Sequence, residues 1–308
     1  MSRIKLLVII RDFSKWVDPE HYYLTKEMSN ITDIVFWHQP GNIHDILKQI
    51  EFVPDFILIF FYASDPGISP PISGLDTLEI PFGVYLQDLH NLNDVEQNIL
   101  KDNVKHIFAS YRDYFYKNFP NLVDRMKWLP HSVNINIFKD YGLNEKDIKM
   151  LMMGAVIEYY YPLRYKILQT FSNHPDFVYH QHPGYRDIDY GHEFVREKYA
   201  FEINRAQLFL TCDSIYKYPL LKYMEVLACN TLLLAPESPE LYDLGFRSEE
   251  NFVAINENNF VEKVQYYLNN PEERKRIAKN GYNLVRNRHT TKIRAKELES
   301  MIRGILES

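Results

Sequence analysis

A lysine and a glutamate, Lys222 and Glu225, lie three positions apart near the start of a helix predicted over residues 221–229. This spacing places both side chains on neighbouring parts of the helix surface. A carboxylate there can accept hydrogen bonds from two vicinal hydroxyls, such as those of a ribose, and the free N–H groups of the first turn, around Leu221, suit a phosphate. The same spacing is typical of an exposed ion pair, which contributes little to stability.

Polar residues before and after this helix extend the candidate site. Residues 211–214 end a predicted strand, and Lys217 lies between that strand and the helix. Asn230 follows the helix at the position where a residue in the left-handed conformation is expected, because Asn is second only to Gly there. We therefore predict a strand, a loop with a cation, and a helix whose first turn faces a ligand.

A second group of polar residues follows the strand predicted over Phe82–Leu86. Asp88 and His90 come directly after this strand, where the loops of parallel sheets carry function. His131 lies with Ser132 in the segment that joins the two halves of the chain. We consider Asp88, His90 and His131 candidate catalytic residues, against the alternatives of a loop carboxylate, a solvated histidine and a hinge contact.

The stretch from His180 to Tyr185 favours a ligand-binding loop over a metal site. His180 and His182 alternate onto one face of a strand, and Asp187, Asp189 and His192 follow, so zinc is an alternative. No spacing among these residues is diagnostic, and we expect no metal. Gly184 allows a tight turn, and one or two of Tyr159–Tyr161 can stack on a sugar or a base.

Composition excludes several classes of protein. The chain has 308 residues, 46% of them hydrophobic and 25% charged, which is ordinary globular composition. The formal net charge of −6 argues against a nucleic-acid partner. The 11 glycines lie too far apart for a dinucleotide fingerprint, a P-loop or a nucleophile elbow. No apolar run is long enough to span a membrane, the N-terminus does not resemble a signal peptide, and the 2 cysteines indicate a reducing cytoplasm.

The first half of the chain alternates strand and helix patterns, which predicts a doubly wound parallel sheet. The expected strands are Ile4–Ile10, Ile34–Trp37, Phe56–Tyr62, Phe82–Leu86 and His106–Ala109, and the expected helices are Pro19–Met28, Ile43–Ile50, Asp94–Lys101 and Tyr111–Asn118.

A second cycle of the same kind begins near Ile148. Its expected strands are Lys149–Gly154, Phe177–His180, Gln207–Thr211 and Thr231–Leu234, and its expected helices are Pro162–Phe171, Tyr199–Arg205 and Leu221–Cys229. We predict an N-terminal domain over residues 1–133 and a C-terminal domain over 134–288. Parallel sheets bind ligands at the carboxyl ends of their strands, so a nucleotide-linked substrate is plausible without a glycine-rich loop.

The C-terminus is expected to be helical. Asn270, Pro271 and Glu273 form a capping-box pattern that starts a helix running to Gly281 or a little beyond. A last helix is predicted over about Thr291–Leu306, within a separate segment 289–308. Lys and Arg exceed Asp and Glu in residues 256–308. Solvated helix faces explain this excess, and weak attraction to an anionic membrane surface or acceptor is the alternative.

Several segments together resemble a known family. The run from Lys222 to Ala235, Lys-Tyr-Met-Glu-Val-Leu-Ala-Cys-Asn-Thr-Leu-Leu-Leu-Ala, resembles the donor-site helix of GT-B glycosyltransferases of the retaining group-1 type, and more narrowly the bacterial spore-maturation type. The segment from Trp128 to Phe138 resembles the interdomain segment of that family. Tyr161-Pro-Leu-Arg164, residues 244–253 and Asn280-Gly281-Tyr282 agree in order. The resemblance covers about residues 80–300.

The resemblance implies two facing Rossmann-like domains, with the last helix crossing back to the first domain. The second domain would bind a nucleotide sugar, UDP-linked by expectation, and the first an unidentified acceptor, with no metal and no cofactor. Glu225 would hold the ribose. Arg164 and Lys222 would face the diphosphate, against the alternative of an exposed helix arginine at 164. His182, Gly184 and Tyr185 would lie near the base.

One position departs from the family pattern. Many group-1 transferases have a second Glu eight residues before the ribose-binding Glu, and this chain has Lys217 there. Lys217 could act on phosphate, the sugar could be held differently, or activity could be lost. Two alternatives to a transferase therefore stay open: a non-enzymatic carbohydrate-binding or coat-associated protein of the same shape, and a nucleotide-sugar epimerase.

Overall fold

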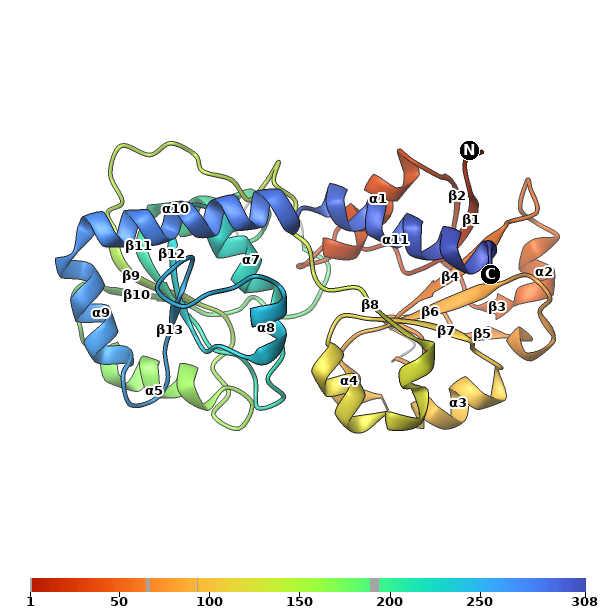
Figure 1. Ribbon diagram of the computed structural model, residues 1–308, viewed down its shortest axis with the longest axis horizontal. Coiled ribbons are helices and arrows are strands. Elements are labelled where there is room, and N and C mark those ends of the chain that lie inside the picture. Colours follow the sequence, from red (N-terminus) through yellow and green to blue (C-terminus); the bar gives the residue numbers. More distant parts are fainter. Residues whose placement is uncertain (1, 65–66, 93, 189–193) are drawn as a thin grey trace. The chain divides into compact units, whose positions relative to one another are not determined.

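The computed structural model describes residues 2–64, 67–92, 94–188 and 194–308. Within these residues the chain forms two compact units (Figure 1). The first unit contains residues 1–14, 21–130 and 292–308, and the second contains residues 15–20 and 131–291. The second unit therefore includes a short segment from near the N-terminus, Lys15–Glu20, which the sequence pattern assigned to the N-terminal domain.

The first unit is built on a parallel sheet with the order β2-β1-β4-β6-β7-β8. Its strands are β1 (Lys5–Ile9), β2 (Asp33–Trp37), β4 (Phe56–Phe60), β6 (Phe82–Leu86), β7 (His106–Ala109) and β8 (Met126–Trp128), and β3 (Gly41–Asn42) pairs with β5 (Ile72–Ser73) separately. β4 and β6 are buried along their whole length, which explains their continuous apolar sequences.

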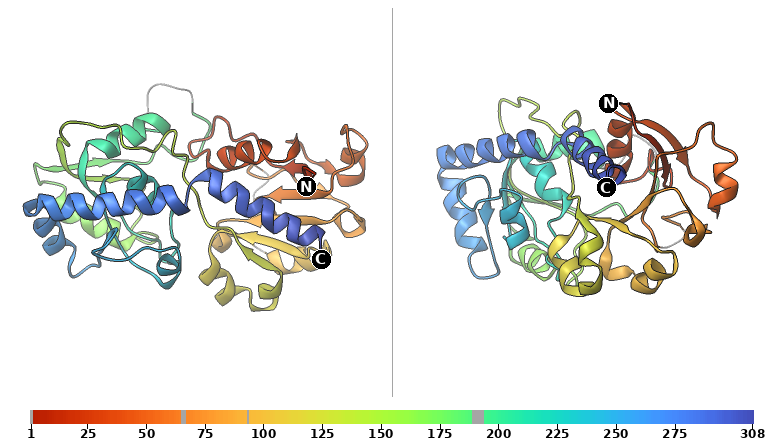
Figure 2. Two further views of the ribbon diagram at one scale, coloured as in Figure 1. Left: turned by 45° about the horizontal axis from the view of Figure 1, so that its top comes forward. Right: turned by 45° about the vertical axis from the view of Figure 1, so that its right-hand side comes forward.

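Helices cover both faces of this sheet. α1 and α11 lie on one side, and α3 and α4 on the other (Figures 1 and 2). The helices of this unit are α1 (Glu20–Ser29), α2 (Ile43–Leu47), α3 (Val95–Lys101), α4 (Arg112–Asn118) and α11 (Thr291–Leu306), with short 3₁₀ turns at Leu75–Thr77, Leu89–Asn91 and Pro120–Arg125. Residues 292–308 pack with this unit, although they follow the second unit in sequence.

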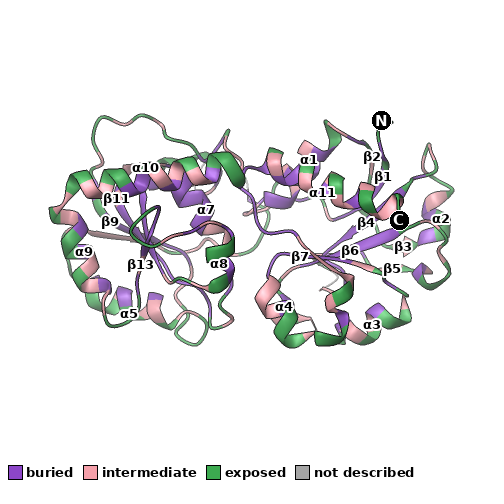
Figure 3. Ribbon diagram, viewed as in Figure 1, coloured by how far each residue is buried: buried purple, intermediate pink, exposed green. Residues whose placement is uncertain are grey.

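The second unit contains a parallel sheet with the order β10-β9-β11-β12-β13. Its strands are β9 (Ile148–Met153), β10 (Phe177–His180), β11 (Ala206–Leu210), β12 (Leu232–Ala235) and β13 (Val253–Ala254). Its helices are α5 (Pro162–Phe171), α6 (Arg196–Arg205), α7 (Leu221–Ala228), α8 (Pro239–Asp243), α9 (Phe260–Asn269) and α10 (Pro271–Arg288). Side chains of α5 and α9 pack on β9, β11 and β12 in one buried core, which Figure 3 shows as the purple centre of this unit.

The α/β architecture with two Rossmann-like sheets confirms the predicted fold. The predicted left-handed conformation of Asn230 is confirmed, because this residue has φ of 53° just after the end of α7.

Two predictions about α10 are wrong. The side chain of Asn270 does not cap this helix but donates to the carbonyl of Tyr266, and Glu273 pairs with Arg276 instead of closing a capping box.

The helix also does not end near Gly281 but continues to Arg288. Gly281 lies inside it because a Cβ there would come 2.4 Å from the carbonyl oxygen of Asn251. Close packing, and not helix termination, explains this glycine.

Candidate functional site

In the second sheet, the chain continues from β9 to β10 on one side and from β11 to β12 on the other side. The point between the neighbouring strands β9 and β11 is therefore the topological switch point of the sheet. Ligands of open parallel sheets bind at such a switch point, outside the carboxyl ends of the strands. Arg164, on the first turn of α5, lies there. Its Nη1 donates to the carbonyl of Ala155 beyond β9 at 2.6 Å, and its Nη2 donates to Oγ1 of Thr211 beyond β11 at 3.3 Å.

Arg164 is only 3% exposed, so the alternative of an exposed helix arginine is wrong. The ring of Tyr161 lies 4.2 Å from its Cζ, and Nη2 also reaches the carbonyl of Cys212 at 3.5 Å. Its buried Nε has no hydrogen-bond partner in the described part of the chain. A buried guanidinium bound to uncharged oxygens, with one N–H left over, is suited to receive an anion.

A second cation comes close to the same point. Gly154 follows β9 with φ of +134°, and a Cβ placed there would lie 3.2 Å from Nη1 of Arg164 and 3.4 Å from Nζ of Lys222. Lys222 is on the first turn of α7, and its Nζ donates to the hydroxyl of Tyr199 at 3.3 Å. Burial, followed by the charge of Arg164, lowers the pKa of Lys222 to about 8. The backbone at Gly154 therefore lies against both cations, and the absence of a Cβ there lets Arg164 and Lys222 converge on the same point.

Glu225 lies one turn further along α7 and is buried, with 8% of its surface exposed. Burial raises the pKa of Glu225 to about 8, with the negative charge of Asp18 the next largest cause, while Lys222 and a hydrogen bond from Tyr199 act in the opposite direction. This burial contradicts the interpretation of Lys222 and Glu225 as a surface ion pair. A buried carboxyl beside two cations is instead typical of a binding site.

The segment Lys15–Glu20 contributes to this unit as well. The Glu20 carboxylate binds Nδ1 of His131 at 2.6 Å through Oε2 and accepts the backbone N–H of Ser132 at 2.7 Å through Oε1. His131 is 4% exposed, and its charge lowers the pKa of Asp18, so it lies near that carboxylate. His131 therefore belongs to a buried network in the second unit.

The loop after β10 presents His182, Gly184 and Tyr185. The N–H of Gly184, which has φ of +94°, donates to Nδ1 of His182 at 3.0 Å, and the Tyr185 ring lies 4.7 Å from the His182 ring and is 72% exposed. Burial, then the charges of Lys222 and Arg164, lower the pKa of His182 to about 4. His182 is therefore neutral at pH 7 and carries its proton on Nε2.

Lys217 projects outward. Its side chain is 71% exposed and pairs with Asp213 at 3.3 Å, and its backbone has φ of 62°. Tyr159 and Tyr160 lie in the loop that follows β9, and they are 70% and 37% exposed. The carbonyl of Tyr160 accepts the N–H of Ile215, which joins this loop to the loop that follows β11. These two loops therefore border the switch point of the sheet.

The histidines considered for zinc have other partners. Nε2 of His180 binds the Glu202 carboxylate at 2.9 Å. In the part of the chain that the structure describes, no group of three or more His, Cys, Asp and Glu side chains could hold a metal ion. Asp189 and His192 lie outside the described residues.

Asp88 and His90 belong to the first unit. Asp88 follows β6 and is exposed, with φ of 47° and ψ of 47°, an uncommon conformation for a residue other than Gly that Asp tolerates better than most. His90 is half-buried, and burial lowers its pKa against the opposing charge of Asp88. Both residues lie at the carboxyl edge of the first sheet, as predicted.

Comparison with known proteins agrees with this arrangement. Residues 155–300 match the family model for glycosyl transferase-like domains. The structure resembles sucrose-phosphate synthase from Thermosynechococcus elongatus, with a TM-score of 0.70 at 10% identity over 99% of this chain and 100% of that one. Residues 155–300 therefore form a glycosyl transferase-like domain, and the chain has the GT-B fold.

Two other solved structures share this fold. A glycosyltransferase from Rickettsia africae has a TM-score of 0.65 at 10% identity, covering 100% of both chains. Anabaena HepE, solved in complex with UDP and glucose, has a TM-score of 0.64 at 9% identity over 98% of this chain and 100% of that one. No curated protein sequence matches the chain. The narrower resemblance to the spore-maturation type stays a prediction.

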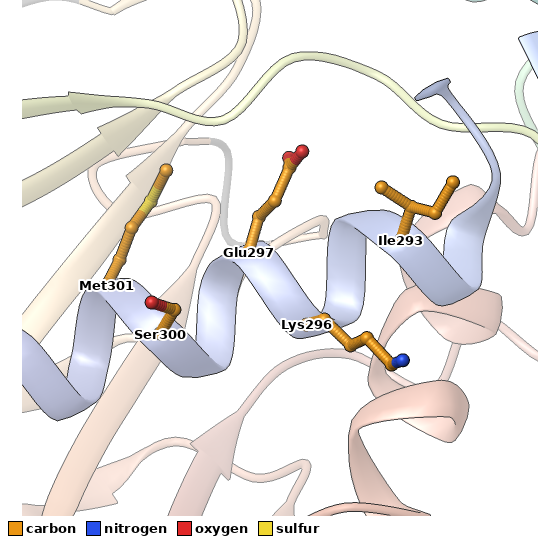
Figure 4. Close-up of a pocket in the computed structure, with 5 residues that line it drawn as sticks. All are labelled: Ile293, Lys296, Glu297, Ser300 and Met301. Carbon is orange, nitrogen blue, oxygen red and sulfur yellow. The ribbon is translucent and has the colours of Figure 1, made fainter. Parts of the chain in front are cut away.

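The first unit also has a hollow of about 390 Å³ on α11, lined by Ile293, Lys296, Glu297, Ser300 and Met301 (Figure 4). Ile293, Glu297 and Met301 project from one side of the helix and Lys296 from the other. This hollow belongs to the first unit and contains none of the cations described above. No helix among the described residues has the length and apolar character that crossing a membrane requires.

Sequence reasoning missed Asp18, Glu20 and Tyr199 as members of the site. Tyr199 was predicted to be helical, but nothing in its spacing distinguishes it from a core residue. Asp18 and Glu20 lie more than a hundred positions before the rest of the site, and only their contacts in the folded chain reveal them.

Proposed function

We propose that the protein is a glycosyltransferase that takes its sugar from a nucleoside diphosphate sugar, with the diphosphate bound at the switch point of the second unit. The observation that carries the proposal is the convergence of Arg164 and Lys222 on Gly154. The unpartnered buried Nε of Arg164 supports it, because leaving such a group unsatisfied is costly unless a ligand completes it.

The two cations suit the chemistry of the leaving group. As the sugar separates, negative charge grows on the departing diphosphate, and fixed cations already in place stabilise it without reorganisation. The start of α7 adds its free N–H groups, since Leu220 at its N-cap makes no side-chain cap. These groups would perform the task that a metal ion performs elsewhere, so we propose a metal-independent reaction, with retention of configuration as the working assumption.

The remaining candidate residues are suited to the other two parts of the donor, the ribose and the base. Glu225, buried beside Lys222, is suited to accept hydrogen bonds from both ribose hydroxyls. The neutral ring of His182, with Gly184 and Tyr185, offers a polar edge and an exposed aromatic face for the base. We use a uridine nucleotide as the first probe, because HepE was solved with UDP and glucose.

We propose Asp88 and His90, at the edge of the first sheet, and His131, in the second unit, as catalytic residues. The 2 free cysteines, Cys212 and Cys229, are buried and fit a reducing compartment, so we propose that the enzyme works in the cytoplasm.

Calorimetric titration with UDP and with uridine tests the proposal directly. We expect UDP to bind and uridine to bind at least about a hundredfold more weakly, because only UDP carries the diphosphate that the two cations recognise. Release of UDP from UDP-glucose then measures turnover. Equal affinities for uridine and UDP would contradict the assignment of Arg164 and Lys222 to the diphosphate.

A further inference from the structure

The segment Lys15–Glu20 is held against the second unit by contacts at both of its ends. At its start, Lys15 and Val17 exchange backbone hydrogen bonds with the 186–188 segment, and Trp16 forms an antiparallel bridge with Asp187. At its end, the Glu20 carboxylate binds His131 and the N–H of Ser132. The backbone between these anchors is thereby fixed, and it carries Asp18.

The Asp18 carboxylate lies within electrostatic range of Lys222 and Glu225, the two charged residues of α7 in the proposed donor site. It is half-buried, and its Oδ1 accepts the N–H of Glu20 at 3.2 Å, which fixes its orientation. Asp18 and Lys222 interact electrostatically, each shifting the pKa of the other toward the charged form, and Asp18 also raises the pKa of Glu225. Burial and the neighbouring charge of Glu20 raise the pKa of Asp18 to about 6, so it is mostly ionised at pH 7.

A carboxylate in this place opposes the binding of a bare diphosphate, since the two like charges repel each other. It favours a ligand that also carries hydroxyl donors or develops positive charge. In glycosyl transfer, the bond from the anomeric carbon to the diphosphate oxygen breaks, and the electron pair leaves with that oxygen. The acceptor hydroxyl bonds to the carbon and releases its proton to the departing diphosphate. Positive charge grows on the sugar ring in between.

We propose that Asp18 faces the transferred sugar and stabilises it in the transition state, while Arg164 and Lys222 stabilise the departing diphosphate. This inference rests on the proposed function and adds a residue outside the 155–300 segment that the glycosyl transferase family model matches. Interactions that are stronger in the transition state than with the bound ground state raise turnover and not affinity. The signature of Asp18 is therefore a loss of turnover without a loss of UDP affinity.

Asp18→Asn is the variant that tests this role. An asparagine keeps the oxygen that accepts the N–H of Glu20, and it removes the charge. Asp12→Asn is a matched control, because Oδ1 of Asp12 accepts the N–H of Ser14 at 2.9 Å in the same kind of turn, in the same loop, within the first unit. For both variants and the wild type, UDP affinity, the melting temperature and UDP release from UDP-glucose are measured.

We expect Asp18→Asn to reduce UDP release at least about tenfold while its affinity for UDP stays equal or rises. Asp12→Asn should match the wild type in both measurements. Unchanged UDP release in Asp18→Asn would overturn the inference. So would a parallel loss of UDP affinity and melting temperature, which would mean that Asp18 only supports the loop. If the wild type itself binds no UDP, the proposed function fails first, and the assignment of Asp18 fails with it.

Discussion

Gly281 on α10 and Leu227 on α7 approach so closely that a Cβ at position 281 would lie 2.6 Å from Cδ2 of Leu227. Helix α7, which carries Lys222 and Glu225, thus packs against α10 at a distance that only glycine at position 281 permits. This contact with α10 fixes the position of α7 in the second unit.

Gly281→Ala should therefore destabilise the protein. The added methyl forces α7, α10 and the carbonyl of Asn251 apart, and overpacking of this kind costs about 1–3 kcal/mol. Thermal unfolding measures the effect. Gly304→Ala is the control, since position 304 is an exposed site in α11 with nothing within 4 Å, where alanine should stabilise the helix. Equal melting temperatures for the two variants would contradict the packing argument.

Arg164→Ala should lower turnover by about 10²–10³-fold, by analogy with the loss of one preorganised donor. Affinity for UDP should fall, and affinity for uridine should hardly change. Lys166→Ala, which removes an exposed cation from the same helix, is the matched control and should retain full activity. Intact UDP release in Arg164→Ala would mean that the diphosphate is held elsewhere.

At pH 9, where Glu225 is mostly ionised because its pKa is about 8, Glu225→Gln should weaken UDP binding by about 1.5–3 kcal/mol, because the neutral amide replaces a charged acceptor of both ribose hydroxyls. Calorimetry with UDP and with 2′,3′-dideoxy-UDP separates this effect from a general disturbance of the site. The dideoxy nucleotide, which lacks both hydroxyls, should bind the wild type and the variant equally. A similar loss for both nucleotides would remove Glu225 from the ribose site.

Affinity for UDP should fall at least about tenfold between pH 7 and pH 9. The pKa of Lys222 is about 8, so over this range Lys222 loses its positive charge. This loss disfavours binding of the negatively charged diphosphate. Lys222→Met should bind UDP more weakly at pH 7 and show a flatter profile. A wild-type affinity independent of pH would contradict the placement of Lys222 at the diphosphate.

UDP release from UDP-glucose should survive treatment with EDTA. The expectation follows from the fixed cations at Gly154, which provide the charge that a metal would otherwise supply. Turnover is measured before and after chelation and again after addition of Mn²⁺ or Mg²⁺. A complete loss that either ion restores would show that the cations of the protein are not sufficient.

The sequence by itself determined the two α/β cycles. Buried strands of parallel sheets have continuous apolar sequences, and β6, β7, β10 and α5 have the predicted bounds. The positions of Lys222, Glu225 and Asn230 followed from local spacing, since a helix start and a helix end are properties of a few adjacent residues. The predicted end of α10 near Gly281 was wrong, because the close contact with Leu227 involves residues 54 positions apart, and periodicity cannot detect it.

Only the tertiary structure decided how the charged groups of the second unit interact. Arg164 looks like any helix-surface arginine in the sequence, and it is buried because the ends of β9 and β11 close around it. Glu20 contacts His131 across 111 positions, and the same segment brings Asp18 into electrostatic interaction with Lys222. Local patterns encode which residues form strands and helices. Burial and electrostatic coupling depend on which distant segments the fold brings together, and sequence spacing does not contain that information.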